Sequence, residues 1–279
     1  MLEILLLPNL SFEVAVEASA RLWAIYAVLA TIELEYVCSH TRYQHFMRTG
    51  FGSAGSLVAG GPGVTTFERA GTRRLGLLIR GGIAAALLIR PSLVWLPLAG
   101  PIALGVVVLL NHWVSRGMWL AREGSDEIGK ATALCLFLTI ALPDSGRLVG
   151  PYLLMAQLLL SYFVAGIIKL VDPSWRSGNA ITGVLNTYSY GHPTAARLLG
   201  GRFASSFLGL CTVAWELTTP LIFVAPKWLI VPFFAIGAMF HVGNMIIMRI
   251  GAFCLGFIAT YPLVLWALFD LRGRLGVHW

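Results

Sequence analysis

Long apolar stretches alternate with short polar ones along this chain. Asp, Glu, Lys and Arg are missing from residues 91–115, 131–142, 148–168, 203–215, 228–248 and 250–269. A transmembrane helix needs roughly 20 mostly apolar residues to cross about 30 Å of hydrocarbon. The strands of an outer-membrane barrel would instead alternate apolar and polar residues, and these stretches do not. The pattern therefore predicts an all-α, polytopic transmembrane helical bundle.

Hydropathy and polar breaks predict about eight helical spans. We place them at residues 12–37, 75–96, 98–120, 127–142, 148–171, 203–223, 228–248 and 251–269. Two connections are long: residues 39–74, rich in Gly, Ser and Arg, are expected to form a flexible loop, and residues 172–201 to form a lid or binding loop. Because no change in composition marks a boundary, we predict one membrane domain over residues 1–279, with no soluble domain.

Composition supports a membrane protein. Hydrophobic residues make up 57% of the chain and charged residues 12%, whereas soluble domains have about 45–50% apolar and about 25% charged residues. The net charge of +7 does not imply nucleic acid, because arginines in short loops between spans are the usual topology signal. We therefore expect membrane lipid, and no nucleic acid, as a partner.

Lys169 is the first candidate for function, because it follows the apolar run SYFVAGII. A charge at the centre of a bilayer costs about 2.5–3.5 kcal/mol on insertion scales, so an ionisable residue within a span is a functional candidate. Burial favours the neutral amine, which is a competent general base near neutral pH. The alternative is that the ammonium group of Lys169 snorkels to the lipid headgroups.

Four further polar residues lie in apolar surroundings. His112 could orient a base or relay a proton, or it could be a satisfied histidine between helices. His241 and Asn244 are three residues apart and share a helix face, where they could contact a ligand or join two helices. No metal site is expected, because no other His, Cys or carboxylate stands at helical ligand spacing from His241. Glu216 is either protonated or paired with an arginine or with Lys169.

Aromatic residues cluster just beyond the span that contains Lys169. Trp175, Tyr188 and Tyr190 all lie in the connection that follows it. Such residues are typical of the aromatic belt at the membrane surface. They could also stack on a planar ligand.

Two stretches resemble the HTTM domain family, the membrane part of vitamin K-dependent γ-carboxylases and of their bacterial relatives. In the first, YFVAGIIKLVDPSWRSGNA, an aromatic-x-Ala-Gly run leads to x-Lys-Leu and then to a polar turn with Trp and Gly. The matching residues here are Tyr162, Phe163, Ala165, Gly166, Lys169, Leu170, Trp175 and Gly178. The second follows the family pattern His-x-x-Asn, Ile-Gly-x-Phe and Ala-x-x-Pro-Leu, with His241, Asn244, Ile250, Gly251, Phe253, Ala259, Pro262 and Leu263. The stretches LNHW and WELTTP are also similar to helices of the family, so the resemblance extends over residues 98–266.

The resemblance implies an enzyme, a quinol-dependent oxidoreductase or a carboxylase-like carbon–carbon lyase. Lys169, assisted by His112, would be the catalytic base that deprotonates a reduced naphthoquinone of the vitamin K or menaquinol type, with the lysine kept neutral in a dry pocket. The quinol anion would react with O2 to give a strong base that takes a γ-proton from a peptide glutamate, which then captures CO2. The ligand-binding residues would be Tyr162, Trp175, Arg176, Glu216, His241 and Asn244. A stand-alone relative of this kind is expected in the bacterial cytoplasmic membrane.

Two departures from the carboxylases limit what carries over. The carboxylases have a large extramembrane portion that recognises the peptide, whereas this chain ends at Trp279, just after the last expected span. Ile168 precedes the lysine where the vertebrate carboxylases have a second lysine. Peptide carboxylation is therefore less expected than a retained quinol-handling core. The alternative is a non-catalytic membrane helper for maturation, export or immunity of a secreted peptide from a neighbouring gene.

Overall fold

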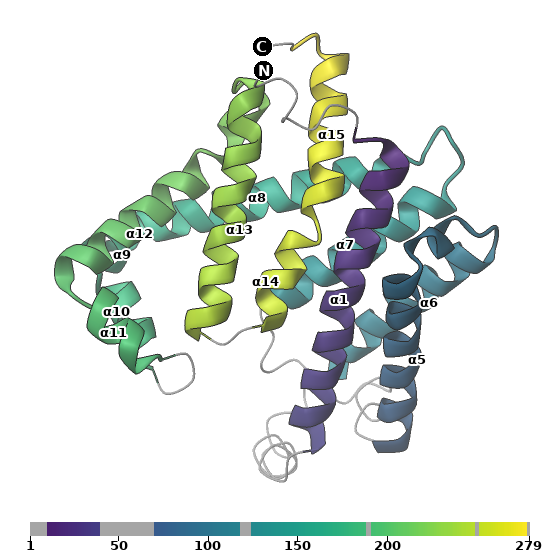
Figure 1. Cartoon of the computed structure of the whole chain (residues 1–279), viewed down its shortest axis with the longest axis horizontal. Coiled ribbons are helices and arrows are strands. Elements are labelled where there is room, and N and C mark those ends of the chain that lie inside the picture. Colours follow the sequence, from purple (N-terminus) through teal and green to yellow (C-terminus); the bar gives the residue numbers. More distant parts are fainter. Residues whose placement is uncertain (1–9, 40–69, 118–123, 188–190, 249–250, 278–279) are drawn as a thin grey trace.

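The computed structural model describes residues 10–39, 70–117, 124–187, 191–248 and 251–277. Helices and short turns make up these ranges, and no strand occurs within them (Figure 1). The all-α prediction is confirmed. Most of the first long connection, residues 40–69, lies outside the described part of the chain, but residues 70–74 belong to a helix.

Seven of the twelve α-helices that the structure describes have 16 or more residues. They are α1 (Phe12–Ser39), α5 (Ala70–Ile89), α6 (Ala99–Gly117), α7 (Gly124–Ala141), α8 (Val149–Val171), α12 (Arg202–Leu217) and α13 (Lys227–Met248). Short helices follow α8, namely α9 (Pro173–Ser177), α10 (Asn179–Leu185) and α11 (Pro193–Leu199), and the last apolar stretch is divided into α14 (Gly251–Ile258) and α15 (Tyr261–Arg274). Two 3-10 turns, η1 (Pro91–Trp95) and η2 (Thr219–Phe223), follow α5 and α12.

The prediction of about eight spans is not confirmed. Four segments are long and apolar enough to cross a membrane: Phe12–Tyr36, Val149–Val171, Lys227–Met248 and Gly251–Arg274. A fifth is added if α11 and α12, which meet at 92°, form one broken span. The other predicted spans are helical but fall short for physical reasons. Charged residues occupy α5 and the first turn of α7, and the apolar part of α6 is short.

Helix α8 is apolar on every side, and its two faces have different surroundings. Leu154, Leu158 and Tyr162 recur every four residues and are buried. Leu160 and Ile168 lie on the other side and are exposed. A helix that is hydrophobic all round is typical of a membrane span, with one face on the protein and one on lipid. In Figure 1, α8 crosses behind α13 and α15, and it packs against α7, α12 and α15.

The second long connection forms three short helices instead of the expected loop. Asp172 caps α9, because its carboxylate accepts hydrogen bonds from the backbone N–H of Ser174 at 2.9 Å and from its hydroxyl at 2.7 Å. These hydrogen bonds hold the pKa of Asp172 below its usual value. His192 caps α11 in a similar way, accepting from the N–H of Ala195. Pro173 and Pro193 begin the two helices, and proline is well suited to a first turn.

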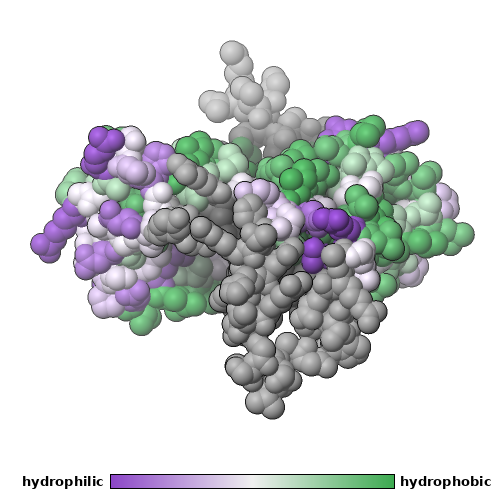
Figure 2. Space-filling view, turned by 90° about the horizontal axis from the view of Figure 1, so that it is seen from below, coloured by the Kyte–Doolittle hydropathy of each residue, from purple (hydrophilic) through white to green (hydrophobic). Residues whose placement is uncertain are grey.

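The end of the molecule formed by α9, α10 and α11 is the more hydrophilic one. In Figure 2 purple and white residues gather at the left, the end where Figure 1 draws these helices, while green predominates toward the right. Arg176, Arg197 and Arg202 are exposed in this region. The polar surface therefore lies next to the end of α8 that carries Lys169.

Candidate functional site

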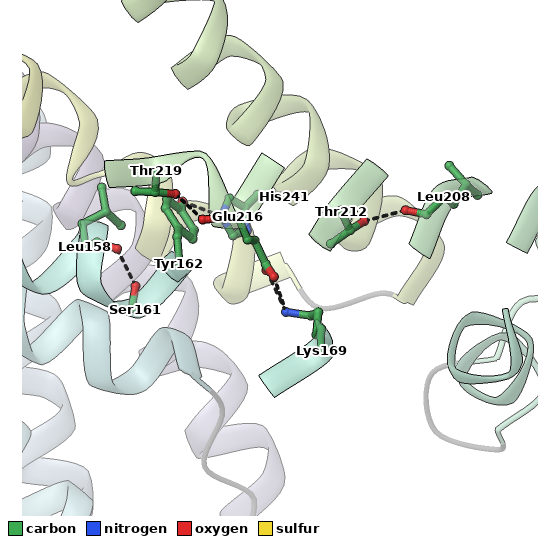
Figure 3. Close-up of polar contacts among 9 residues, drawn as sticks. All are labelled: Leu158, Ser161, Tyr162, Lys169, Leu208, Thr212, Glu216, Thr219 and His241. Carbon is green, nitrogen blue, oxygen red and sulfur yellow. Dashed lines mark hydrogen bonds and ion pairs between the residues drawn. The ribbon is translucent and has the colours of Figure 1, made fainter. Parts of the chain in front are cut away.

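Lys169 and Glu216 form an ion pair between α8 and α12 (Figure 3). The Nζ atom of Lys169 donates to Oε1 of Glu216 at 2.7 Å and to Oε2 at 2.8 Å. The lysine side chain is 18% exposed and the glutamate side chain only 4%. Of the partners considered for Glu216 from the sequence, the structure thus selects Lys169. The ammonium group points to this carboxylate instead of snorkelling.

Gly166 allows this pairing because it lets the two helices approach closely. A Cβ atom at this position would lie 2.9 Å from Cβ of Glu216 and 3.1 Å from the backbone nitrogen of Leu217. Real Cβ atoms essentially never make the first of these contacts, and the second is tighter than most. The glycine therefore brings α12 against α8 one turn before Lys169.

Trp175 is a second neighbour of the ammonium group. Nζ of Lys169 lies 5.2 Å from the centroid of the Trp175 ring, a cation–π distance. Helix α9 holds this ring in place, since the Trp175 carbonyl packs on Gly209 of α12 and Arg176 donates from Nη1 to the carbonyl of Leu170. Trp175 thus belongs to the site, whereas the exposed guanidinium of Arg176 helps to fix the turn that presents it.

Two groups contact the Nζ atom of Lys169. A carboxylate accepts two of its hydrogen bonds and an aromatic face lies nearby, and each of these contacts stabilises a positive charge. A base at this position would therefore act within hydrogen-bond reach of a carboxylate.

A second polar cluster lies deeper on the same helix. The hydroxyl of Tyr162 is 2.8 Å from Nε2 of His241 and 2.9 Å from the hydroxyl of Tyr261, which joins α8, α13 and α15. The ring of His241 stacks on Phe257 with centroids 4.3 Å apart. The histidine is 1% exposed, and its Nδ1 atom has no hydrogen-bond partner among the described residues. This cluster is neutral, aromatic and enclosed.

The two clusters are neighbours on one face of α8. Tyr162 and Lys169 are seven residues apart, or about two turns and roughly 10 Å along the axis. Trp215 connects them, because its ring centroid is 4.9 Å from that of Tyr162 and it directly precedes Glu216. Figure 3 shows Tyr162, His241, Glu216 and Lys169 together in this part of the molecule.

His112 and Asn244 are not brought into either cluster. His112 is exposed on α6, which packs against α5, η1 and α7. Its neighbour Asn111 is the buried one, and the amide Nδ2 of Asn111 has no partner in the described part of the chain. Asn244 is half-buried on α13 and makes no hydrogen bond with another described residue. Tyr188 and Tyr190 lie outside the described residues.

Tyr261 is the site residue that sequence reasoning missed. It stands between Ala259 and Pro262, two positions of the second family-like stretch, yet an aromatic residue in an apolar run carries no sign of a buried hydroxyl pair. The break between α14 and α15 turns this tyrosine inward, at the start of the last helix. The signal that could have found it is the polar pair Thr260–Tyr261 inside an otherwise apolar stretch.

Fold and site together define a class, that of helical integral membrane proteins with a charged pair and a hydrogen-bonded aromatic cluster inside the apolar helices. Residues 149–267 match the family model of the HTTM domain, so the family resemblance is confirmed over this part of the chain. The match includes Lys169, Glu216 and His241 but not His112. No curated protein and no solved structure matches this chain.

Proposed function

We propose that this protein is a membrane enzyme that activates a reduced naphthoquinone of the vitamin K or menaquinol type, with Lys169 as its base. The observation that carries the proposal is the buried Lys169–Glu216 pair within the HTTM match. An ion pair inside apolar helices is expensive to keep, and such residues are functional candidates by default. The HTTM domain is associated with vitamin K-dependent carboxylase-like proteins, in which a lysine has this role.

The residues around Lys169 fit a lipid-soluble quinol. Ile168 and Val171 flank the lysine and are exposed on the apolar surface, so a ligand dissolved in the bilayer can approach Nζ without crossing a polar region. Trp175 offers an aromatic face next to the ammonium group. Planar rings stack well on such a face. A quinol at this site would place its hydroxyl next to Nζ and its ring by the indole.

In this proposal each residue has a limited task. Lys169 accepts the hydroxyl proton of the quinol, which supplies electrons for the reaction with O2. Trp175 orients the ring, and the buried Tyr162–His241 pair fixes the adjoining part of α8. His112 is exposed on α6, so an assisting role for it rests on the family resemblance alone. The resemblance also points to a peptide as the final acceptor, and the quinol step can be tested without it.

The same ion pair supports a second function, that of a non-catalytic membrane helper for a secreted peptide. A bidentate contact between two helices is also a structural link, and buried polar contacts hold helices together in membranes. A helper needs the charge of Lys169 but not its free amine. The two functions therefore differ in whether Lys169 must lose a proton.

Lys169→Arg separates them, because arginine keeps the positive charge and the bidentate geometry but cannot be deprotonated in a protein. Purified protein in liposomes would receive reduced menaquinone, with O2 uptake and quinone formation measured. We expect the variant to lose quinol turnover by about 100-fold or more, the usual size of general-base effects, while it folds like the parent. Lys130→Arg is the matched control, since Lys130 pairs with Glu127 at 2.7 Å on α7; it should turn over quinol normally.

The outcomes that count against the enzyme are equally concrete. Quinol turnover by Lys169→Arg at the parent rate would exclude Lys169 as base. Absence of turnover in the parent, with normal peptide maturation in cells carrying Lys169→Arg, would favour the helper. Mass analysis of lipids extracted from the purified protein adds a direct check, because a co-purifying menaquinone is expected only for the enzyme.

A further inference from the structure

We propose that Glu216 is a positioning residue that receives the proton of Lys169, so that the lysine–glutamate pair, and not the amine alone, constitutes the base. The inference rests on the proposed function of Lys169 and deepens it. It answers the difficulty that the contacts of Lys169 stabilise an ammonium group. It also gives Glu216 a task different from contacting a ligand.

The geometry allows a proton to pass within the pair. Both carboxylate oxygens lie within hydrogen-bond distance of Nζ, at 2.7 and 2.8 Å, so transfer along either hydrogen bond needs no movement of the heavy atoms. Thr219 holds the backbone of Glu216 by donating its hydroxyl to the Glu216 carbonyl at 2.7 Å. Because Gly166 packs closely on the Cβ atom of Glu216, the backbone of the glutamate stays next to the lysine.

The exposures of the two side chains assign their roles. Lys169 is 18% exposed and Glu216 only 4%, so an incoming ligand meets the amine first and the carboxyl group lies behind it. Within the described part of the chain, Lys169 is the side chain that donates to the carboxylate of Glu216. A buried carboxylate whose cation is lost is strongly disfavoured. Neutralising the lysine therefore requires a proton on Glu216.

Other titratable groups near the pair are not placed to accept the proton of Lys169. On the elements packed against α8 and α12, Tyr162 is hydrogen-bonded to His241 and Tyr261, Asp172 accepts from Ser174, and Arg176 donates to a backbone carbonyl. Each is engaged with another partner. The proton of Lys169 has its nearest acceptor in Glu216.

The resting pair, an ammonium and a carboxylate, has no net charge. When an apolar ligand covers Lys169 and excludes water, the free energy of the neutral pair falls relative to that of the ion pair. An N–H bond of Lys169 then breaks and an O–H bond forms on Glu216, so that the pair becomes an amine and a carboxylic acid. The amine then takes the hydroxyl proton of the ligand, giving an ammonium beside a protonated Glu216. The pair now carries one positive charge next to the negative ligand oxygen, and no electrons are transferred.

Glu216→Gln tests this, because the amide is a neutral isostere of the protonated acid. The first readout is labelling of Lys169 by an amine-reactive acylating reagent, followed by mass spectrometry across a range of pH. We expect labelling in the variant to begin at least about one pH unit lower, or about tenfold more labelling at a fixed pH. Lys130 serves as the internal control, since its partner Glu127 is unchanged. Labelling of Lys169 that follows the parent curve would overturn the proposal.

The second readout is the pH profile of quinol turnover. For Glu216→Gln we expect the acidic limb of kcat/KM to move to lower pH in step with labelling, and Glu216→Asp, which keeps a carboxyl group, to retain the parent profile at reduced turnover. A pair that serves only to join the helices would lower the yield of folded protein and could still move the labelling curve, but the pH profile of turnover per folded molecule would stay that of the parent. If Glu216→Gln does not fold, a Glu216→Asp profile displaced like that of a neutral residue contradicts the proposal. Labelling needs no turnover, so a parent without quinol activity but with the expected labelling shift would sink the proposed enzyme and leave the proton sharing intact.

Discussion

Helix α8 carries two polar clusters whose buried groups are stabilised in different ways. The Lys169–Glu216 pair is charged and partly open at its lysine, whereas the Tyr162–His241–Tyr261 cluster is neutral and closed in by aromatic rings. Desolvating ions costs far more than burying neutral groups that bond to one another. Charge is therefore found at the end of the helix, and neutral hydrogen bonding in its middle. The comparison indicates that the open cluster is the place for chemistry and the closed one for architecture.

Removing only one charge of the Lys169–Glu216 pair should have the largest effect on stability. Lys169→Met leaves Glu216 buried without its cation, and we expect a loss of about 3–5 kcal/mol in the free energy of unfolding. The double variant Lys169→Met with Glu216→Leu removes both charges and should recover most of that loss. Reversible unfolding in mixed detergent micelles measures both. A double variant no more stable than the single one would show that the charges are not coupled.

Breaking the neutral cluster should cost less. Tyr162→Phe keeps the ring but removes the hydroxyl, leaving His241 and Tyr261 without their partner, at about 1–3 kcal/mol for each group left unsatisfied. Quinol turnover per folded molecule should stay close to that of the parent, because the cluster acts through the position of α8. The same unfolding assay, combined with the turnover assay, checks this. A complete loss of turnover in well-folded Tyr162→Phe would place the cluster in the chemistry instead.

Gly166→Ala tests whether the charged pair depends on close packing of α8 and α12, because it pushes the two helices apart. The new methyl group would meet Glu216 and Leu217, and such overpacking costs about 1–3 kcal/mol. Gly183 is the matched control, because an added Cβ there meets no other atom within 4 Å; alanine in that helix should be neutral or stabilising. Thermal unfolding of the two variants should therefore shift in opposite directions, or not at all for Gly183→Ala. Equal destabilisation by both would contradict close packing at Gly166.

The smallest effect is expected at Asp172, the N-cap of α9, which is the helix that holds Trp175 next to Lys169. Because hydrogen bonds lower the pKa of Asp172, its stabilising contribution is present above the ordinary value of 3.8 and is lost as the pH falls through the lowered value. The protection factors of the α9 amides, which correct for the intrinsic pH dependence of exchange, should thus fall in acid in the parent. Asp172→Asn keeps a capping oxygen and should remove this pH dependence. Persistence of the acid effect in that variant would assign it to another group.

Much of the fold could be predicted because apolar runs reveal helices directly. The eight predicted spans all correspond to helices, yet their number as crossings was not confirmed, since periodicity does not distinguish a full span from a shorter apolar helix. Residues 251–269 illustrate this: the sequence is continuously apolar, but the helix breaks before Tyr261. The caps at Asp172 and His192 each precede a proline, but the stretch around them was predicted as a lid or binding loop, not as short helices.

The site was predictable where a charge stood out, and less so where orientation mattered. Lys169 and Glu216 are conspicuous because lipid-facing helices rarely hold ionisable groups. Asn111 and His112 are adjacent on a helix with apolar residues on every side, so no hydrophobic face indicated that the asparagine turns inward and the histidine outward. The hydroxyl of Tyr261 was hidden for the same reason. Three-dimensional packing decides such cases, and the linear pattern does not contain it.

The length of α12 links the charged pair to bilayer thickness. The helix has 16 residues, or about 24 Å, whereas the hydrocarbon core of a typical bilayer is about 30 Å thick. A helix this short does not cross such a core by itself, in line with its bend of 92° against α11. Glu216 lies one residue before its end. The charged pair is therefore held where a short helix stops, and α12 needs no full crossing of the bilayer to bring a carboxylate to Lys169.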